Sequence, residues 1–124
     1  MKLEVGMYVR TKKGNVGKIT KITKECIFFD RIMYLGFIKT GIQPKYLYKD
    51  KIDTRVIKAS HSIKGLIEDN DLVKFKIYGE LAVCEVYNKS LVKYDGEVFD
   101  LEELDIVSIL TKEQFESMSY KVGE

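Results

Sequence analysis

The sequence has no tryptophan, one proline, one histidine and two cysteines among its 124 residues. A single proline excludes a proline-rich linker or ligand, and two cysteines do not make a disulfide scaffold. Cys26 and Cys84 both stand in apolar, strand-like stretches, so we expect them to be reduced core residues. A structural disulfide and a reactive thiol remain as less favoured alternatives.

Long apolar runs are absent too. No stretch approaches the roughly 20 apolar residues that a helix needs to cross a bilayer. The first residues do not have the pattern of a secretory leader. We therefore expect no membrane partner and a cytoplasmic location.

Motifs for nucleotide, metal and covalent chemistry are also absent. The sequence has no phosphate loop, GxGxxG, CxxC or HExxH, and His61 has no nucleophile elbow or paired acid near it. The acidic stretch from Asp95 to Asp105 does not have the spacing of a calcium loop. We expect no catalytic residues, no cofactor and no metal, which predicts a binding protein and not an enzyme.

Short runs of β-branched and aromatic residues, separated by turn residues, fill most of the chain. The first half is predicted to form strands over 7–11, 16–23, 26–29, 31–38, 46–48 and 54–57, with a turn at 12–15. A loop is expected around Gly41 and Pro44. The second half is predicted to form strands over 72–77, 81–87, 91–94, 97–99 and 106–110. Asp95-Gly96 is the strongest hairpin signal, because both central residues of such a turn take positive φ.

Two short helical pieces are expected between and after these strands. Ser62 is a plausible N-cap for a single helical turn in the middle of the chain. Thr111-Lys112-Glu113-Gln114 matches a capping box, and Phe115 and Met118 supply an apolar face for a short C-terminal helix.

The strand-turn-strand texture around Gly14 recurs around Gly79. It predicts a mainly β fold, either two small SH3-like barrels or a single two-sheet β domain, and the tandem is favoured. In the tandem, 1–55 is a basic N-terminal small β-barrel. Residues 56–70 are a connecting segment with a helical turn, and 71–124 are an acidic C-terminal β subdomain with a terminal helix.

Charge divides the chain into a basic and an acidic half. Residues 1–60 hold 14 Lys and Arg against 5 Asp and Glu, whereas residues 61–124 hold 7 against 14. Such a split bears on partners and association, not on fold. The candidate anion-binding residues of the basic half are Tyr8, Arg10, Lys12, Lys13, Lys18 and Lys21. The candidate acidic surface, for a basic partner, consists of Asp95, Glu97, Asp100, Glu102 and Glu103.

For both charged surfaces there is an alternative to partner binding, because charged residues often form only a solvent-exposed face. Tyrosines supply stacking surfaces in nucleic-acid-binding proteins, but in β proteins they are more often half-buried packing. The tyrosines in question are Tyr8, Tyr34, Tyr46 and Tyr48.

Two resemblances add to this reading. The opening Val5-Gly6-Met7-Tyr8-Val9-Arg10, followed by Gly14-Asn15-Val16-Gly17-Lys18-Ile19, resembles the start of a small barrel of the SH3 or KOW type. That resemblance implies architecture and, more weakly, nucleic-acid or ribosome binding. The phrases Lys58-Ala59-Ser60-His61 and Thr111-Lys112-Glu113-Gln114-Phe115-Glu116 resemble small proteins of Gram-positive phages and prophages. This second resemblance implies a phage accessory protein in the host cytoplasm.

Three functions stay open at this point. The first is a non-catalytic phage accessory protein, such as an anti-CRISPR or other anti-defence inhibitor, that binds a host protein or protein–nucleic-acid complex. The second is a module that binds nucleic acid directly through the basic half, and the third is a small-nucleotide-binding protein or minor enzyme. The complementary charges and the aromatic residues of the first half also predict a homodimer.

Overall fold

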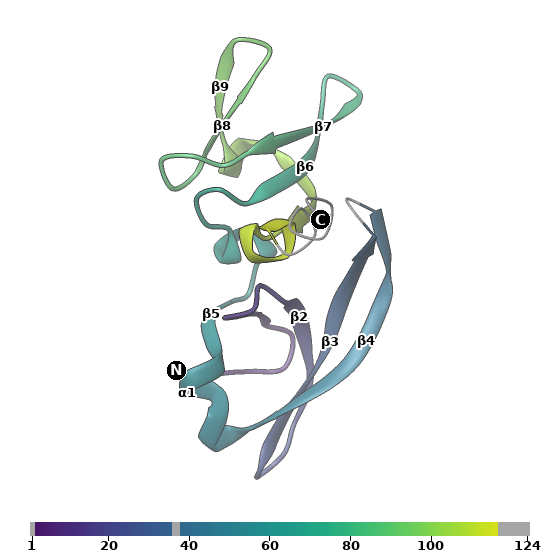
Figure 1. Cartoon of the computed structure of the whole chain (residues 1–124), viewed down its shortest axis with the longest axis vertical. Coiled ribbons are helices and arrows are strands. Elements are labelled where there is room, and N and C mark those ends of the chain that lie inside the picture. The colour runs from purple at the N-terminus through teal and green to yellow at the C-terminus, as the bar shows by residue number, and fades with distance from the viewer. Residues whose placement is uncertain (1, 36–37, 117–124) are drawn as a thin grey trace. The chain divides into compact units, whose positions relative to one another are not determined.

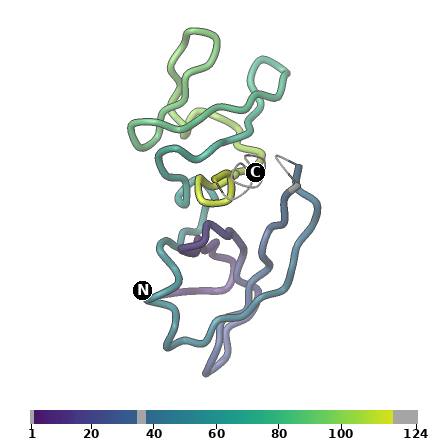
Figure 2. The backbone as a smooth tube through the Cα atoms, in the orientation of Figure 1, coloured from purple at the N-terminus to yellow at the C-terminus, as the bar shows by residue number. Residues whose placement is uncertain are grey.

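The computed structural model describes residues 2–35 and 38–116 (Figures 1 and 2). The chain divides into two compact units, Met1–Leu66 and Ile67–Glu124. Each unit is built from antiparallel strands, so the predicted mainly β fold is confirmed. No helix within the described ranges is long and apolar enough to span a membrane.

The first unit is a five-stranded sheet with the order β4-β3-β2-β1-β5. Its strands are β1 (Tyr8–Thr11), β2 (Val16–Ile22), β3 (Cys26–Leu35), β4 (Ile38–Tyr48) and β5 (Val56–Ser60). The 3-10 helix η1 (Lys49–Lys51) and the one-turn helix α1 (Ile52–Arg55) join β4 to β5, and η2 (Ile63–Leu66) follows β5. The last strand of this unit, β5, returns beside the first, β1, after the short helix α1.

One face of this sheet carries the core of the first unit. The buried cluster consists of Met7, Val9, Ile19, Ile27, Phe29, Ile52 and Val56. Strand alternation puts Ile27 and Phe29 in this core and turns Phe28, between them, to the opposite face. The same alternation in β4 turns Leu47 toward the core and its neighbours Tyr46 and Tyr48 away from it.

One local prediction in the first half, a loop, is wrong. Gly41 and Pro44 were expected to mark a loop, but both lie within β4, where Gly41 pairs with Met33 and Pro44 with Asp30. Proline is tolerated there because β4 is an edge strand, whose outward N–H groups have no partner in the sheet.

The expected connecting segment over 56–70 is also placed differently. Val56–Ser60 is β5, which pairs with β1, so the first unit extends to Leu66. The predicted middle helical turn is η2, where the Lys64 N–H donates to the Ser62 hydroxyl oxygen at 3.2 Å, as the expected N-cap requires.

The second unit has a three-stranded sheet, β10-β6-β7, and a two-stranded sheet, β8-β9. Its strands are β6 (Leu72–Ile77), β7 (Glu80–Glu85), β8 (Leu91–Tyr94), β9 (Glu97–Asp100) and β10 (Asp105–Leu110). The 3-10 helix η3 (Leu101–Glu103) precedes β10. Strand β6 lies between the second and last strands of its unit, as β1 lies between β2 and β5, so the same connection pattern occurs in both units.

The turns and the C-terminal helix of the second unit follow the predictions from local sequence. Asp95 and Gly96 have φ of 52° and 80°, as the predicted hairpin turn requires. Residues 112–116 are helical, and the Gln114 N–H donates to the Thr111 hydroxyl oxygen at 3.4 Å. Met118, expected on the apolar face of this helix, lies outside the described residues.

Candidate functional site

The face of the first sheet opposite its core carries aromatic and basic side chains in register. Tyr8 in β1 pairs with Lys18 in β2. Phe28 in β3 pairs with Lys21 on one side and with Tyr46 in β4 on the other. Tyr48, two residues beyond Tyr46, points to the same side of the sheet. We call this surface the outer face and define it as Tyr8, Lys18, Lys21, Phe28, Tyr46 and Tyr48.

Three aromatic rings of the outer face contact one another across β3 and β4. The ring centroids of Phe28 and Tyr46 are 6.2 Å apart, and those of Tyr46 and Tyr48 are 5.6 Å apart with an edge-to-face angle of 86°. Yet 57% of Tyr46 and 52% of Tyr48 remain exposed to solvent. Adjoining aromatic surface that folding leaves in contact with water is characteristic of binding sites.

The two lysines of the outer face lie over its rings. Lys18 Nζ is 5.7 Å from the centroid of the Tyr8 ring, and Lys21 Nζ is 5.8 Å from that of Phe28. A cation over a ring holds the ammonium group close to the aromatic surface while leaving it accessible to an anion. Asp30, which pairs with Lys18, puts one carboxylate on the same face.

One phenol group of the outer face, that of Tyr48, supplies no negative charge near neutral pH. The neighbouring Tyr46 raises the pKa of Tyr48 above its usual value, with a smaller contribution from Cys26. The Tyr48 ring is therefore neutral near neutral pH, and Lys18 and Lys21 supply positive charge on the outer face.

A basic pocket of about 480 Å³ lies beside the edge strand β4 of the first unit. Its lining comes from the β1–β2 turn, from β3 and β4, and from α1. The lining residues are Thr11, Lys12, Lys13, Asn15, Phe29, Lys45, Tyr46, Leu47, Thr54 and Arg55. Four of them are cationic and none is acidic, so this hollow attracts anions.

Local hydrogen bonds fix two walls of the basic pocket. Lys12 and Lys13 occupy the middle of a tight turn that the Gly14 N–H closes on the Thr11 carbonyl oxygen at 2.9 Å. Gly14 has φ of 86°, which a glycine adopts without strain. The Lys12 N–H donates to the Arg55 carbonyl oxygen at 2.9 Å, so the turn and the end of α1 are tied together.

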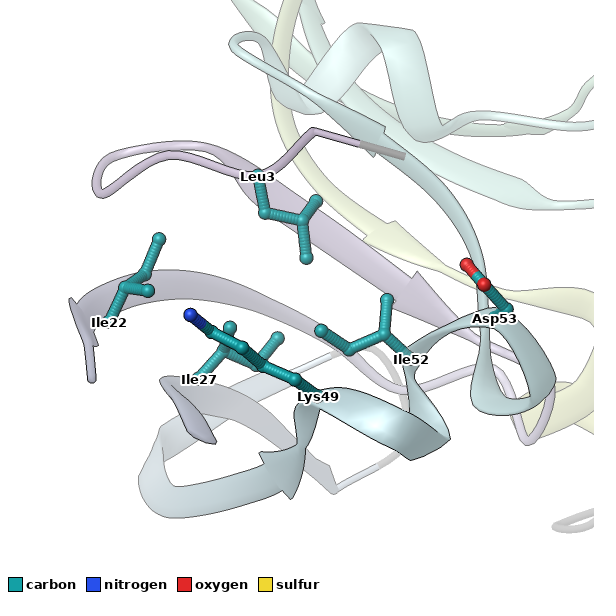
Figure 3. Close-up of a pocket in the computed structure, with 6 residues that line it drawn as sticks. All are labelled: Leu3, Ile22, Ile27, Lys49, Ile52 and Asp53. Atoms are coloured by element: carbon teal, nitrogen blue, oxygen red, sulfur yellow. The ribbon is translucent and has the colours of Figure 1, made fainter. Parts of the chain in front are cut away.

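A second pocket of the first unit, of about 340 Å³, has a different chemistry. Figure 3 shows Leu3 and Ile52 between the ammonium group of Lys49 and the carboxylate of Asp53, and Ile22 and Ile27 close to Lys49. The lining residues are Leu3, Ile22, Ile27, Lys49, Ile52 and Asp53. With one cation and one carboxylate beside four aliphatic residues, this hollow has no excess of positive charge.

The structure divides the candidate anion-binding residues into three groups. Tyr8, Lys18 and Lys21 lie on the outer face, and Lys12 and Lys13 line the basic pocket. Arg10 is placed differently from the prediction, because it is fully buried and its Nη1 donates to the Leu66 carbonyl oxygen at 3.0 Å. Arg10 is therefore a structural residue and not part of an exposed patch.

Sequence reasoning missed three residues of these surfaces. Phe28 was predicted as part of an apolar strand and counted among the aromatic residues that favour a homodimer, and Lys45 and Arg55 were not assigned to a site. A signal for Phe28 was present in the sequence: in a strand, a residue between the apolar Ile27 and Phe29 points to the face opposite theirs. The position of Lys45 and Arg55 around one pocket depends on the β3–β4 register and on α1, which composition does not reveal.

The predicted acidic surface lies on the β8–β9 hairpin and on η3 of the second unit. Glu97 accepts a hydrogen bond from the Tyr78 hydroxyl at 3.3 Å, and Asp100 accepts one from the Glu102 N–H at 3.0 Å. In the part of the chain that the structure describes, no three His, Cys, Asp or Glu side chains are grouped as a metal site would need.

Comparisons with known proteins show no family for this chain. No family model and no solved structure matches it. It is 27% identical over 110 residues to the ribonucleoside-diphosphate reductase large subunit of Plasmodium falciparum. The aligned part is 86% of this chain but spans only 13% of that protein's length, so the similarity does not assign an activity.

Proposed function

We propose that the first unit binds single-stranded nucleic acid without catalysing a reaction. Unpaired bases stack on the rings of the outer face, and the phosphates between them contact Lys18 and Lys21. The observation that carries this proposal is the combination of exposed, adjoining rings and ring-bound lysines on one side of one sheet. Aromatic platforms interleaved with cations are the usual means of binding single strands.

The charge of the basic half supports the same ligand. Residues 1–60 carry nine more basic than acidic residues, counted as 14 against 5. An excess of this size attracts a polyanion and accelerates its association. A duplex offers phosphates but keeps its base faces stacked, so the exposed rings favour a single strand.

Removal of the two most exposed rings of the outer face tests the proposal. Tyr46→Ala together with Tyr48→Ala should weaken binding of a fluorescently labelled single-stranded oligonucleotide by at least about tenfold, since each stacked base contributes about 1–3 kcal/mol. Tyr78→Ala with Tyr87→Ala is the matched control, because these tyrosines are also exposed but belong to the second unit. Fluorescence anisotropy measures both affinities.

Two results would count against this function. The first is failure of the wild-type protein to bind any single strand at about 50 mM salt, where phosphate contacts are strong. The second is an equal loss of affinity in the two double variants, which would show that the rings of the outer face have no special role.

A second candidate function is binding of a host protein, as expected for a phage anti-defence inhibitor. Exposed aliphatic residues on the second unit favour it: 55% of Leu81 and 43% of Val83 are exposed, both on β7. Leu81→Ser with Val83→Ser should abolish capture of such a partner and leave oligonucleotide affinity unchanged. Loss of oligonucleotide binding in this variant would argue against separate surfaces.

A further inference from the structure

The basic pocket has more positive charge than an internal phosphate of a nucleic-acid strand needs. It is lined by Lys12, Lys13, Lys45 and Arg55. None of these four side chains forms an ion pair with any residue that the structure describes. Four like charges around one hollow repel one another, and an anion between them relieves that repulsion.

The number of charges points to a terminal phosphate. An internal phosphodiester carries one negative charge, whereas a terminal phosphate carries about 1.5 to 2 near neutral pH and has three acceptor oxygens. A guanidinium group and several ammonium groups match that set of oxygens. We infer that the basic pocket binds a terminal phosphate group, carried either by the end of a nucleic-acid strand or by a free nucleotide.

The pocket is held in shape before any ligand arrives. Lys12 and Lys13 project from a hydrogen-bonded turn, and the backbone bond from Lys12 to Arg55 ties that turn to α1. Lys45 stands opposite Phe29 in the β3–β4 pair, so its backbone is fixed by the sheet. A fixed backbone reduces the ordering that binding requires.

The place of the pocket in the sheet connects it with the outer face. Lys45 and Tyr46 are consecutive in β4, so their side chains point to opposite sides of the sheet. Because β4 is an edge strand, the end of a single strand stacked on Tyr46 reaches the pocket by passing around that edge. When the terminal phosphate belongs to a nucleic-acid strand, the inference rests on the proposed function.

Oligonucleotides that differ only at their ends test the inference. Equal sequences are compared with a 5′-phosphate, a 3′-phosphate or two terminal hydroxyls, by anisotropy at one salt concentration. One phosphorylated form should bind about tenfold or more tightly than the hydroxyl form, the gain that a charge-assisted contact of about 1.4 kcal/mol gives. AMP and ATP, measured by calorimetry, represent the free-nucleotide source.

Variants locate the effect in the pocket. Lys45→Ala with Arg55→Ala should abolish the preference for a terminal phosphate and the binding of AMP or ATP. Lys24→Ala with Lys39→Ala removes the same charge from exposed positions of the first unit that do not line the pocket. This control variant should keep the preference for a terminal phosphate and the binding of AMP or ATP. Lys12→Ala with Lys13→Ala repeats the test if the first variant does not fold.

The outcomes separate this inference from the proposed function. Nucleotide binding without oligonucleotide binding would support the pocket and contradict the proposed function. Oligonucleotides that bind equally with every end, together with no nucleotide binding, would overturn the inference and leave the proposed function in place. Equal competition by a poly-glutamate peptide would also overturn it, since the pocket would then bind any polyanion.

Discussion

At Gly17 the backbone of β2 runs close to β3, and this contact leaves no room for a side chain. A Cβ atom there would lie 2.6 Å from the Asp30 carbonyl oxygen and 2.7 Å from the Phe29 ring. Gly17→Ala should therefore lower the free energy of unfolding by about 1–3 kcal/mol, the usual cost of overpacking. Urea denaturation measures this change, and a free energy equal to that of the wild type would show that the two strands can separate without cost.

Tyr48 gives the outer face a pH dependence in the alkaline range. The folded chain favours the neutral phenol, because Tyr46 raises the pKa of Tyr48. The stabilisation is therefore fully present below the pKa of an unfolded tyrosine, about 10, and is lost as the pH rises beyond it. The stability of the wild type should fall more steeply above this pH than that of Tyr48→Phe in parallel denaturation curves. An equally steep loss of stability in the two proteins would show that Tyr48 is not the cause of the pH dependence.

Arg10 shows where single residues escape prediction from sequence. The sequence predicts the strand that contains Arg10 and shows other basic residues near it. Strand alternation puts Val9 on the core face and its neighbours Tyr8 and Arg10 on the opposite face. The buried Arg10 donates a hydrogen bond to Leu66, 56 positions away along the chain, in the 3-10 helix η2. Short-range patterns do not reveal such a contact, so an exposed cation and a buried one look alike in the sequence.

Strands and turns were predictable where the cause is local. The dipeptide Asp95-Gly96 allows the positive φ that its turn needs, and the prediction is confirmed. Gly41 and Pro44 have equally clear local signals, yet pairing along the whole length of β3 keeps them in a strand. The contacts among Phe28, Tyr46 and Tyr48 depend on the same β3–β4 pairing. For this reason Tyr46 and Tyr48 were named beforehand only as candidate stacking residues, and Phe28 was not assigned to a binding surface for nucleic acid.

Asp71 joins two segments of the second unit, the turn that follows Glu68 and the start of the helix over 112–116. It is fully buried, and its carboxylate accepts hydrogen bonds from the Glu68 N–H at 2.8 Å and from the Lys112 N–H at 2.9 Å. Asp71→Ala leaves both donors without this acceptor, so we expect a loss of about 1–3 kcal/mol of stability for each one that stays buried.

Asp71→Asn is the matched control for this prediction. The amide has almost the same shape but keeps only one acceptor oxygen, so an intermediate stability is expected in the same urea denaturation. Equal stability of the wild type and Asp71→Ala would show that the carboxylate does not hold these segments together.

On the scale of the whole molecule, charge and surface are distributed unequally between the two units. The aromatic rings with lysines over them and the basic pocket belong to the first unit, and the predicted acidic surface belongs to the second. This distribution fits a chain in which the first unit binds the polyanion. Self-association into a homodimer stays a prediction, which light scattering checks against the chain mass of 14.4 kDa.

The salt dependence of oligonucleotide binding tests the central claim most directly. For single strands, the logarithm of the affinity falls with the logarithm of salt concentration by about 0.7 for each phosphate neutralised. Lys18→Ala with Lys21→Ala should therefore make the slope shallower by about 1.4. Lys74→Ala with Lys76→Ala, which removes the same charge from the second unit, should leave it unchanged. A wild-type affinity that does not depend on salt, or equal slopes for both variants, would contradict binding of nucleic acid at the outer face.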